Sequence, residues 1–233
     1  MRKSEPLPPI DAEGGRYRER AVERGHTALL SIDMQNMECG KTLRQRARDP
    51  KSDEAKKRSF FDRVEQVVIP NQQRLLAAAR AHGIEVIFTT IESLTKDGRD
   101  RSLDHKISRI HAPRGSWDAK VIDEVAPQGD EIVIPKTASG IFNSTNIEYV
   151  LRNLDIRYLI VFGVLTEQCV ESTIRDAADR GFMVTQVEDC CATYSTGSHE
   201  ASIRAMRGHY CRTRSTDEMI AELDQIGAVK KRA

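Results

Sequence analysis

Five short apolar runs, each bounded by polar residues, recur along the chain. They cover residues 28–32, 84–90, 131–134, 158–162 and 183–187. Runs of this length and composition are typical of strands that are buried on both faces of a parallel sheet. The pattern therefore predicts five strands of such a sheet.

Segments with apolar residues at helical spacing separate these runs. One begins near Pro70 and ends at Gly83, and others lie within residues 143–154, 168–181 and 199–208. Proline is tolerated in a first helical turn, and glycine commonly ends a helix. Strands that alternate with helices of this length indicate βαβ crossovers. We expect an α/β fold, with one doubly wound, mostly parallel sheet and helices on both faces, in a Rossmann-like arrangement of three layers.

The same pattern separates a terminal arm from the expected domain. Residues 1–24 are polar, with several prolines and a glycine pair, and we interpret them as an arm that lies on the surface or on a neighbouring subunit. Residues 41–58 are strongly charged and lack periodicity, as expected of an exposed loop or a solvated helix. Residues 25–233 are expected to form a single domain.

The composition of the chain argues against nucleic acid, membranes and metal ions as binding partners. The chain has 36 basic and 35 acidic residues, so its net charge of +1 creates no long-range attraction to nucleic acid or to an anionic membrane. No apolar stretch is long enough for a signal segment or a membrane span, and we expect a soluble, cytoplasmic protein. The five cysteines and six histidines form no zinc-binding spacing, so reduced thiols and no metal or other cofactor are expected.

Three complementary side chains stand at the predicted carboxyl ends of strands, where open parallel sheets bind their ligands. Asp33 and Lys136 each follow one run, and Cys169 lies in the segment after a third. A cysteine near a helix start is favoured as a thiolate, an ammonium adds to that effect, and a carboxylate is able to accept the thiol proton. The backbone N–H groups of Leu165 and Cys169 are the expected oxyanion hole.

Each of these residues also has an ordinary interpretation. A lone cysteine on an apolar helix is usually a core residue, an aspartate after a strand often caps a turn, and a lone lysine is usually solvated. The joint occurrence of Asp33, Lys136 and Cys169 at three strand ends favours catalysis over three separate structural roles.

The segments around these residues resemble the isochorismatase-like cysteine hydrolases, a family that includes nicotinamidases and several amidohydrolases. The motifs that carry the resemblance are residues 28–36, 134–145 and 161–193, within a similar region of about residues 26–226. The resemblance implies a general acid/base at Asp33, a thiolate-supporting lysine at Lys136 and a nucleophile at Cys169. It also implies a cis peptide bond at Val164–Leu165 and a homodimer or homotetramer.

Some branches of the family fit the sequence less well. Isochorismatases proper cleave a vinyl ether and usually lack the cysteine, so Cys169 favours C–N cleavage. Nicotinamidases carry histidine metal ligands soon after the first motif, and no histidine lies between Met34 and Phe61. Residues 113–136 look most like the ureidoacrylate amidohydrolases, which implies a ureido substrate.

Residues that shape the substrate pocket are harder to predict from sequence. By their proximity to the three motifs, we expect substrate contacts from Asn36, Glu92, Trp117, Phe142 and Gln168. The charged segment 92–109 is expected to be a lid that sets specificity. If the substrate carries a carboxylate, the lid offers four cations to bind it, namely Arg99, Arg101, Lys106 and Arg109.

The sequence thus predicts a cysteine-dependent amidohydrolase that cleaves a small amide, ureido or carbamoyl substrate through a thioester on Cys169. Two alternatives stay open, an isochorismatase-type ether hydrolase and a catalytically silent binding or scaffold member of the family. The exact substrate, the choice between dimer and tetramer, and the contribution of a neighbouring subunit to the pocket also stay open.

Overall fold

The computed structural model describes residues 17–226 and contains one sheet of six parallel strands in the order β3-β2-β1-β4-β5-β6. The strands are β1 (Thr27–Ile32), β2 (Glu85–Ile91), β3 (Ile132–Lys136), β4 (Tyr158–Val164), β5 (Met183–Ala192) and β6 (Arg212–Arg214). Every residue of β1 and β4 is buried, which explains why their sequences are continuous apolar runs. The α/β prediction is confirmed.

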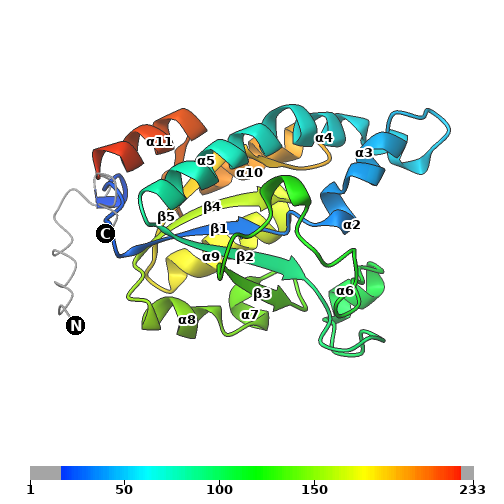
Figure 1. Ribbon diagram of the computed structural model, residues 1–233, viewed down its shortest axis with the longest axis horizontal. Coiled ribbons are helices and arrows are strands. Elements are labelled where there is room, and N and C mark those ends of the chain that lie inside the picture. The colour runs from blue at the N-terminus through cyan, green and yellow to red at the C-terminus, as the bar shows by residue number, and fades with distance from the viewer. Residues whose placement is uncertain (1–16, 227–233) are drawn as a thin grey trace.

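Helices cover both faces of the sheet (Figure 1). Longer helices α5 (Ile69–Ala81) and α11 (Thr216–Gln225) lie along one face, and α7 (Ile141–Ser144), α8 (Ile147–Asn153) and α9 (Glu171–Asp179) lie along the other. The remaining helical segments are α2 (Asn36–Cys39), α3 (Lys41–Arg46), η1 (Asp53–Lys57), α4 (Arg58–Arg63), η2 (Val64–Val68), α6 (Leu103–Ile107), η3 (Asp123–Val125), η4 (Thr166–Val170) and α10 (Thr196–Met206). Both α2 and α6 lie beyond the carboxyl ends of the strands.

The strand and helix boundaries differ from the sequence prediction in three places. Strand β5 continues to Ala192, so Cys190 and Cys191 lie inside it rather than after it. Strand β6 and helix α11 had no counterpart in the prediction. The helix predicted to begin near Pro70 has its first α-helical residue at Ile69, and the π-helical turn η2 leads directly into it. Proline lacks the N–H that a regular helix needs, and a wider turn is one way for a helix to accommodate it.

The described part of the predicted N-terminal arm packs on its own chain. The Val22 N–H donates to Glu222 Oε1 of α11 at 2.9 Å, and the Tyr158 hydroxyl donates to Glu23 Oε1 at 2.7 Å. The rest of the predicted arm, residues 1–16, lies outside the described residues. Within residues 17–226, no helix combines the length and apolar character that a membrane crossing requires.

Candidate active site

Asp33 directly follows β1, the central strand next to β2 and β4. Its φ of 53° lies in the left-handed region, which a non-glycine residue adopts only when its surroundings hold it there. Strand β2 provides that support, because the Asp33 N–H donates to the Thr89 carbonyl at 3.1 Å and Thr89 Oγ1 donates to Asp33 Oδ1 at 3.2 Å. The carboxylate is thereby directed away from the sheet and toward the loops.

Lys136 is the last residue of β3, and its side chain is fully buried. Its Nζ lies 2.8 Å from Asp33 Oδ2 and donates to Cys169 Sγ at 3.3 Å and to the Ala138 carbonyl at 3.0 Å. The ammonium thus makes two hydrogen bonds and one ion pair. Lys136 therefore joins the carboxylate and the thiol into one buried cluster.

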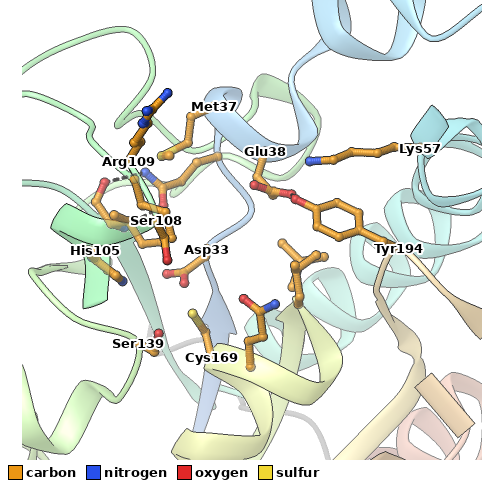
Figure 2. A pocket seen from close by; sticks show the side chains of 16 residues that line it. Asp33, Met37, Glu38, Lys57, His105, Ser108, Arg109, Ser139, Cys169 and Tyr194 are labelled. Atoms are coloured by element: carbon orange, nitrogen blue, oxygen red, sulfur yellow. Dashed lines mark hydrogen bonds between the residues drawn. The ribbon is translucent and has the colours of Figure 1, made fainter. Parts of the chain in front are cut away.

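Cys169 reaches the cluster from the segment that follows β4. The Val164–Leu165 peptide bond is cis, as the family resemblance implies, and the π-helical turn η4 begins at Thr166 and continues into α9. Cys169 lies in η4, and its side chain points toward Asp33 at the carboxyl ends of the strands (Figure 2). Leu165 and Cys169, whose N–H groups are the expected oxyanion hole, both line the same cavity.

Burial and the two neighbouring charges set the protonation of the cluster. Burial raises the pKa of the Cys169 thiol to about 12, and the Asp33 carboxylate raises it as well, while Lys136 lowers it. Burial lowers the pKa of Lys136, but Asp33 and Cys169 outweigh burial, and the net shift is upward. These shifts favour an ammonium at Lys136 and a protonated thiol at Cys169.

A cavity of about 380 Å³ opens above the cluster. Its wall opposite the lid consists of Glu38, Tyr194 and Lys57 (Figure 2). The Tyr194 hydroxyl donates to the Glu38 carboxylate, and the Lys57 ammonium lies 3.9 Å from the centre of the Tyr194 ring. Burial raises the pKa of Glu38, because a buried site disfavours the charged carboxylate.

The predicted lid supplies the other wall of the cavity. Segment 92–109 contains the short helix α6, and His105, Ser108 and Arg109 line the cavity together with Ile110. Of the four cations expected to bind a carboxylate, only Arg109 lines it.

The other three lid cations are held by the lid itself. Arg99 pairs with Asp97, Arg101 donates to the carbonyls of Gly98 and Ile110, and Lys106 donates to the carbonyl of Arg99.

Of the five residues expected to contact substrate, Gln168 lines this cavity and four do not. Asn36 Nδ2 donates to the Trp117 carbonyl, and Glu92 Oε1 accepts from the Gly115 N–H, so both hold neighbouring loops. Trp117 is 58% exposed outside the cavity. Phe142 packs against Phe182, with ring centres 5.9 Å apart. Proximity in sequence to a motif therefore did not imply access to the cavity.

Several residues that line the cavity were not predicted from the sequence. Glu38, Lys57, Tyr194 and His105 come from segments with no recognisable motif, and only the folded chain brings them together. All five cysteines are buried with free thiols. In the part of the chain that the structure describes, no cluster of three or more His, Cys, Asp or Glu side chains is arranged to hold a metal ion.

Comparison with known proteins finds relatives that are named as an amidase and as an amidohydrolase. The chain is 30% identical to N-carbamoylsarcosine amidase of Arthrobacter sp over 166 residues, which cover 69% of this chain and 63% of the amidase. It is 32% identical to ureidoacrylate amidohydrolase RutB of Variovorax paradoxus over 194 residues, or 76% of this chain and 72% of that protein. The chain thus matches less than two thirds of the length of the amidase and more than two thirds of the length of the Variovorax protein.

Solved structures give the same fold. A cysteine hydrolase from Pseudomonas syringae pv. phaseolicola superposes with a TM-score of 0.74 at 24% identity, covering 89% of this chain and 96% of that one. An isochorismatase family protein from Desulfovibrio vulgaris gives a TM-score of 0.67 at 25% identity, covering 86% and 97%. The sequence-family model described as the isochorismatase domain matches residues 27–218 of this chain. With most of its length matched, the chain belongs to the isochorismatase family.

Proposed function

We propose that this chain is a cytoplasmic, cysteine-dependent amidohydrolase that cleaves a C–N bond in a small amide, ureido or carbamoyl substrate. The observation that carries the proposal is the buried cluster in which Lys136 Nζ contacts both Asp33 Oδ2, at 2.8 Å, and Cys169 Sγ, at 3.3 Å. A carboxylate, an ammonium and a thiol at the floor of a cavity are the groups that thiol-dependent acyl transfer requires.

The first half of the reaction forms a thioester. When substrate displaces water from the cavity, Asp33 takes the thiol proton and the sulfur attacks the carbonyl carbon of the substrate. The N–H groups of Leu165 and Cys169 are proposed to bind the negative oxygen of the tetrahedral intermediate. As the intermediate collapses, the C–N bond breaks and Asp33 returns the proton to the departing nitrogen.

The second half releases the acid and restores the thiol. Water attacks the thioester carbon and transfers a proton to Asp33, and the C–S bond then breaks to leave a thiolate. The ammonium of Lys136 stabilises that thiolate at 3.3 Å until the proton returns to sulfur from Asp33. Lys136 remains protonated throughout, because its pKa is raised by the two acidic neighbours despite its burial.

Relatives named ureidoacrylate amidohydrolase and N-carbamoylsarcosine amidase support a substrate with a terminal ureido or carbamoyl group. The cavity supports the same class, because its walls carry polar and charged groups on both sides of the thiol. A compact substrate with several hydrogen-bonding atoms suits such walls.

The test measures ammonia release from ureido acids, carbamoyl amino acids, biuret and simple primary amides, by wild type and by Cys169→Ala. Turnover that the variant loses while keeping its far-ultraviolet circular dichroism supports the proposal. Full activity in Cys169→Ala overturns it. Silence of the wild type across the panel favours the scaffold hypothesis if Cys169 reacts with iodoacetamide no faster than an ordinary thiol, and indicates a different substrate if Cys169 is reactive. Pyruvate release from isochorismate favours the ether hydrolase.

The short helix α6 carries exposed aliphatic side chains that bear on the oligomeric state. On α6, Leu103 is 73% exposed and Ile107 is 72% exposed, so two aliphatic side chains one helical turn apart face outward. We propose that a second copy covers this helix in a homodimer or homotetramer. Light scattering of wild type and of Ile107→Asp tests this, and a monomeric wild type contradicts it.

A further inference from the structure

His105 is a fully buried histidine on α6 that lines the cavity above Cys169. In Figure 2 its imidazole is directed from the lid toward the side of the cavity that holds Asp33, Ser139 and Cys169. The mechanism proposed above assigns it no role. Its position beside the reacting groups therefore calls for a separate explanation.

Neither ring nitrogen of His105 has a hydrogen-bond partner. Buried polar groups normally have one, since an unpaired group forfeits the hydrogen bonds that it made with water. His199 illustrates the usual arrangement, because its Nδ1 bonds Thr166 Oγ1 at 2.9 Å and its Nε2 bonds Arg63 at 3.3 Å. Because the unpaired imidazole of His105 lines a cavity, it is available to hydrogen-bond a ligand there.

The charge state of His105 suits hydrogen bonding to a neutral polar group. Burial lowers the pKa of His105, and the nearby ammonium of Lys136 lowers it further. At neutral pH the ring is therefore uncharged, with one nitrogen as a donor and the other as an acceptor. It complements amide and ureido groups, which carry both N–H donors and carbonyl acceptors.

We propose that His105 is a substrate-binding residue that hydrogen-bonds a polar group adjacent to the scissile amide. This inference rests on the proposed function. It adds that the favoured substrate carries a second hydrogen-bonding group, as ureido and carbamoyl compounds do, and that binding of this group pairs the buried imidazole.

The experiment compares wild type, His105→Phe and His105→Gln with the ureido or carbamoyl compound that the wild type hydrolyses best. Phenylalanine fills the space without a polar atom, and glutamine restores a donor and an acceptor. We expect KM to rise about tenfold in His105→Phe, the loss of one hydrogen bond to a buried group, and to recover in His105→Gln. Calorimetric binding of the same compound to Cys169→Ala, with and without His105→Phe, gives the affinity without turnover.

Thermal unfolding separates binding from structural support. Because His105 makes no internal hydrogen bond, His105→Phe is expected to unfold at the wild-type temperature or above it. The matched control is His111→Phe, since His111 Nε2 is also buried and unpaired but His111 does not line the cavity. Its KM should equal that of the wild type.

The outcomes distinguish the two proposals. Wild-type turnover with an unchanged KM and affinity in His105→Phe overturns the role of His105 and leaves the proposed function intact. A large drop in unfolding temperature with a lower kcat but unchanged KM also overturns it, because His105 would then be structural. No hydrolysis and no binding by any protein in the series overturns the proposed function and this inference with it.

Discussion

The side chain of Lys136 is fully buried at the carboxyl ends of the strands. Its ammonium contacts the Asp33 carboxylate, the Cys169 thiol and the backbone carbonyl of Ala138. A buried charge is stable only while its counter-charge is present, because neither ion regains water inside the protein. The cluster therefore couples chemistry to stability at a single residue. The sequence predicts that Asp33, Lys136 and Cys169 meet at one edge of the sheet, and the tertiary structure adds that Lys136 Nζ contacts the other two directly.

Lys136→Met is expected to reduce both properties. Turnover should fall more than about 100-fold without the ammonium that stabilises the thiolate. The free energy of unfolding should fall by about 3 kcal/mol, because Asp33 is left as an unpaired buried charge. Denaturant titration and the ammonia assay measure the two effects. The exposed Lys51→Met serves as a control, and equal stability of both variants would contradict the prediction.

Where β4 becomes η4, one glycine allows the backbones to approach closely. Gly163 has a φ of 130° and pairs with Ile32 in the register of β1 and β4. A Cβ at this position would lie 2.1 Å from the Ile32 carbonyl oxygen. The position of Cys169 thus depends on a contact between two strands that only glycine permits.

Gly163→Ala is expected to destabilise the chain by more than about 3 kcal/mol, because an overlap with backbone cannot be relieved by rotating a side chain. Gly181→Ala is the matched control. Gly181 has a φ of 81°, but nothing lies within 4 Å of its added Cβ, so the cost should be about 1 kcal/mol from conformation alone. Denaturant midpoints measure both, and similar losses would contradict the role of the close approach.

The predicted lid is the second element of the site, and it contributes His105, Ser108 and Arg109 to the lining of the cavity. Arg109 lines the cavity, whereas the guanidinium of Arg99 is occupied by Asp97. Arg109→Met should raise KM about tenfold for a ureido acid and leave it unchanged for an uncharged ureido compound. The control, Arg99→Met, should change neither. An equal effect on charged and uncharged compounds would show that Arg109 does not pair with a carboxylate.

At the scale of the whole molecule, His199 joins three helical segments that lie apart in the sequence. It lies on α10 and bonds Thr166 at the start of η4 and Arg63 at the end of α4. A guanidinium only donates, so Nε2 accepts from Arg63 and Nδ1–H donates to Thr166 Oγ1. Burial lowers the pKa of His199 to about 4, and Arg63 adds to the effect.

This shift makes global stability depend on pH. The unfolded chain binds a proton at His199 below about pH 6.5, while the folded chain does not until about pH 4. Stability therefore falls as the pH drops through this window. Relative to wild type, His199→Gln should remove roughly 1 kcal/mol of that pH dependence, allowing for partial exposure of the ring. Denaturant titration of both proteins at pH 4.5 and pH 7 measures this difference. An equal change in the free energy of unfolding of wild type and His199→Gln between the two pH values would contradict the assignment.

Strand β6 shows how the assembled molecule overrides a local pattern. Its residues are Arg-Thr-Arg, which no hydrophobicity rule identifies as a strand. Arg212 is nevertheless buried, because its guanidinium binds Glu222 of α11 and Thr185 Oγ1 of β5. Strand β6 is not evident from its own sequence, whereas α11 begins with a local signal, the capping box formed by Ser215 and Glu218.

The sequence by itself determined the buried strands, the alternation with helices and the three candidate reactive residues, because apolar runs and strand ends are local features of the chain. Only the tertiary structure decided which side chains face the cavity. Asn36 and Glu92 hold loops, while Glu38, Tyr194 and His105 form walls. The reason is physical: a cavity is defined by where distant segments fail to fill space, and that depends on packing across the whole fold.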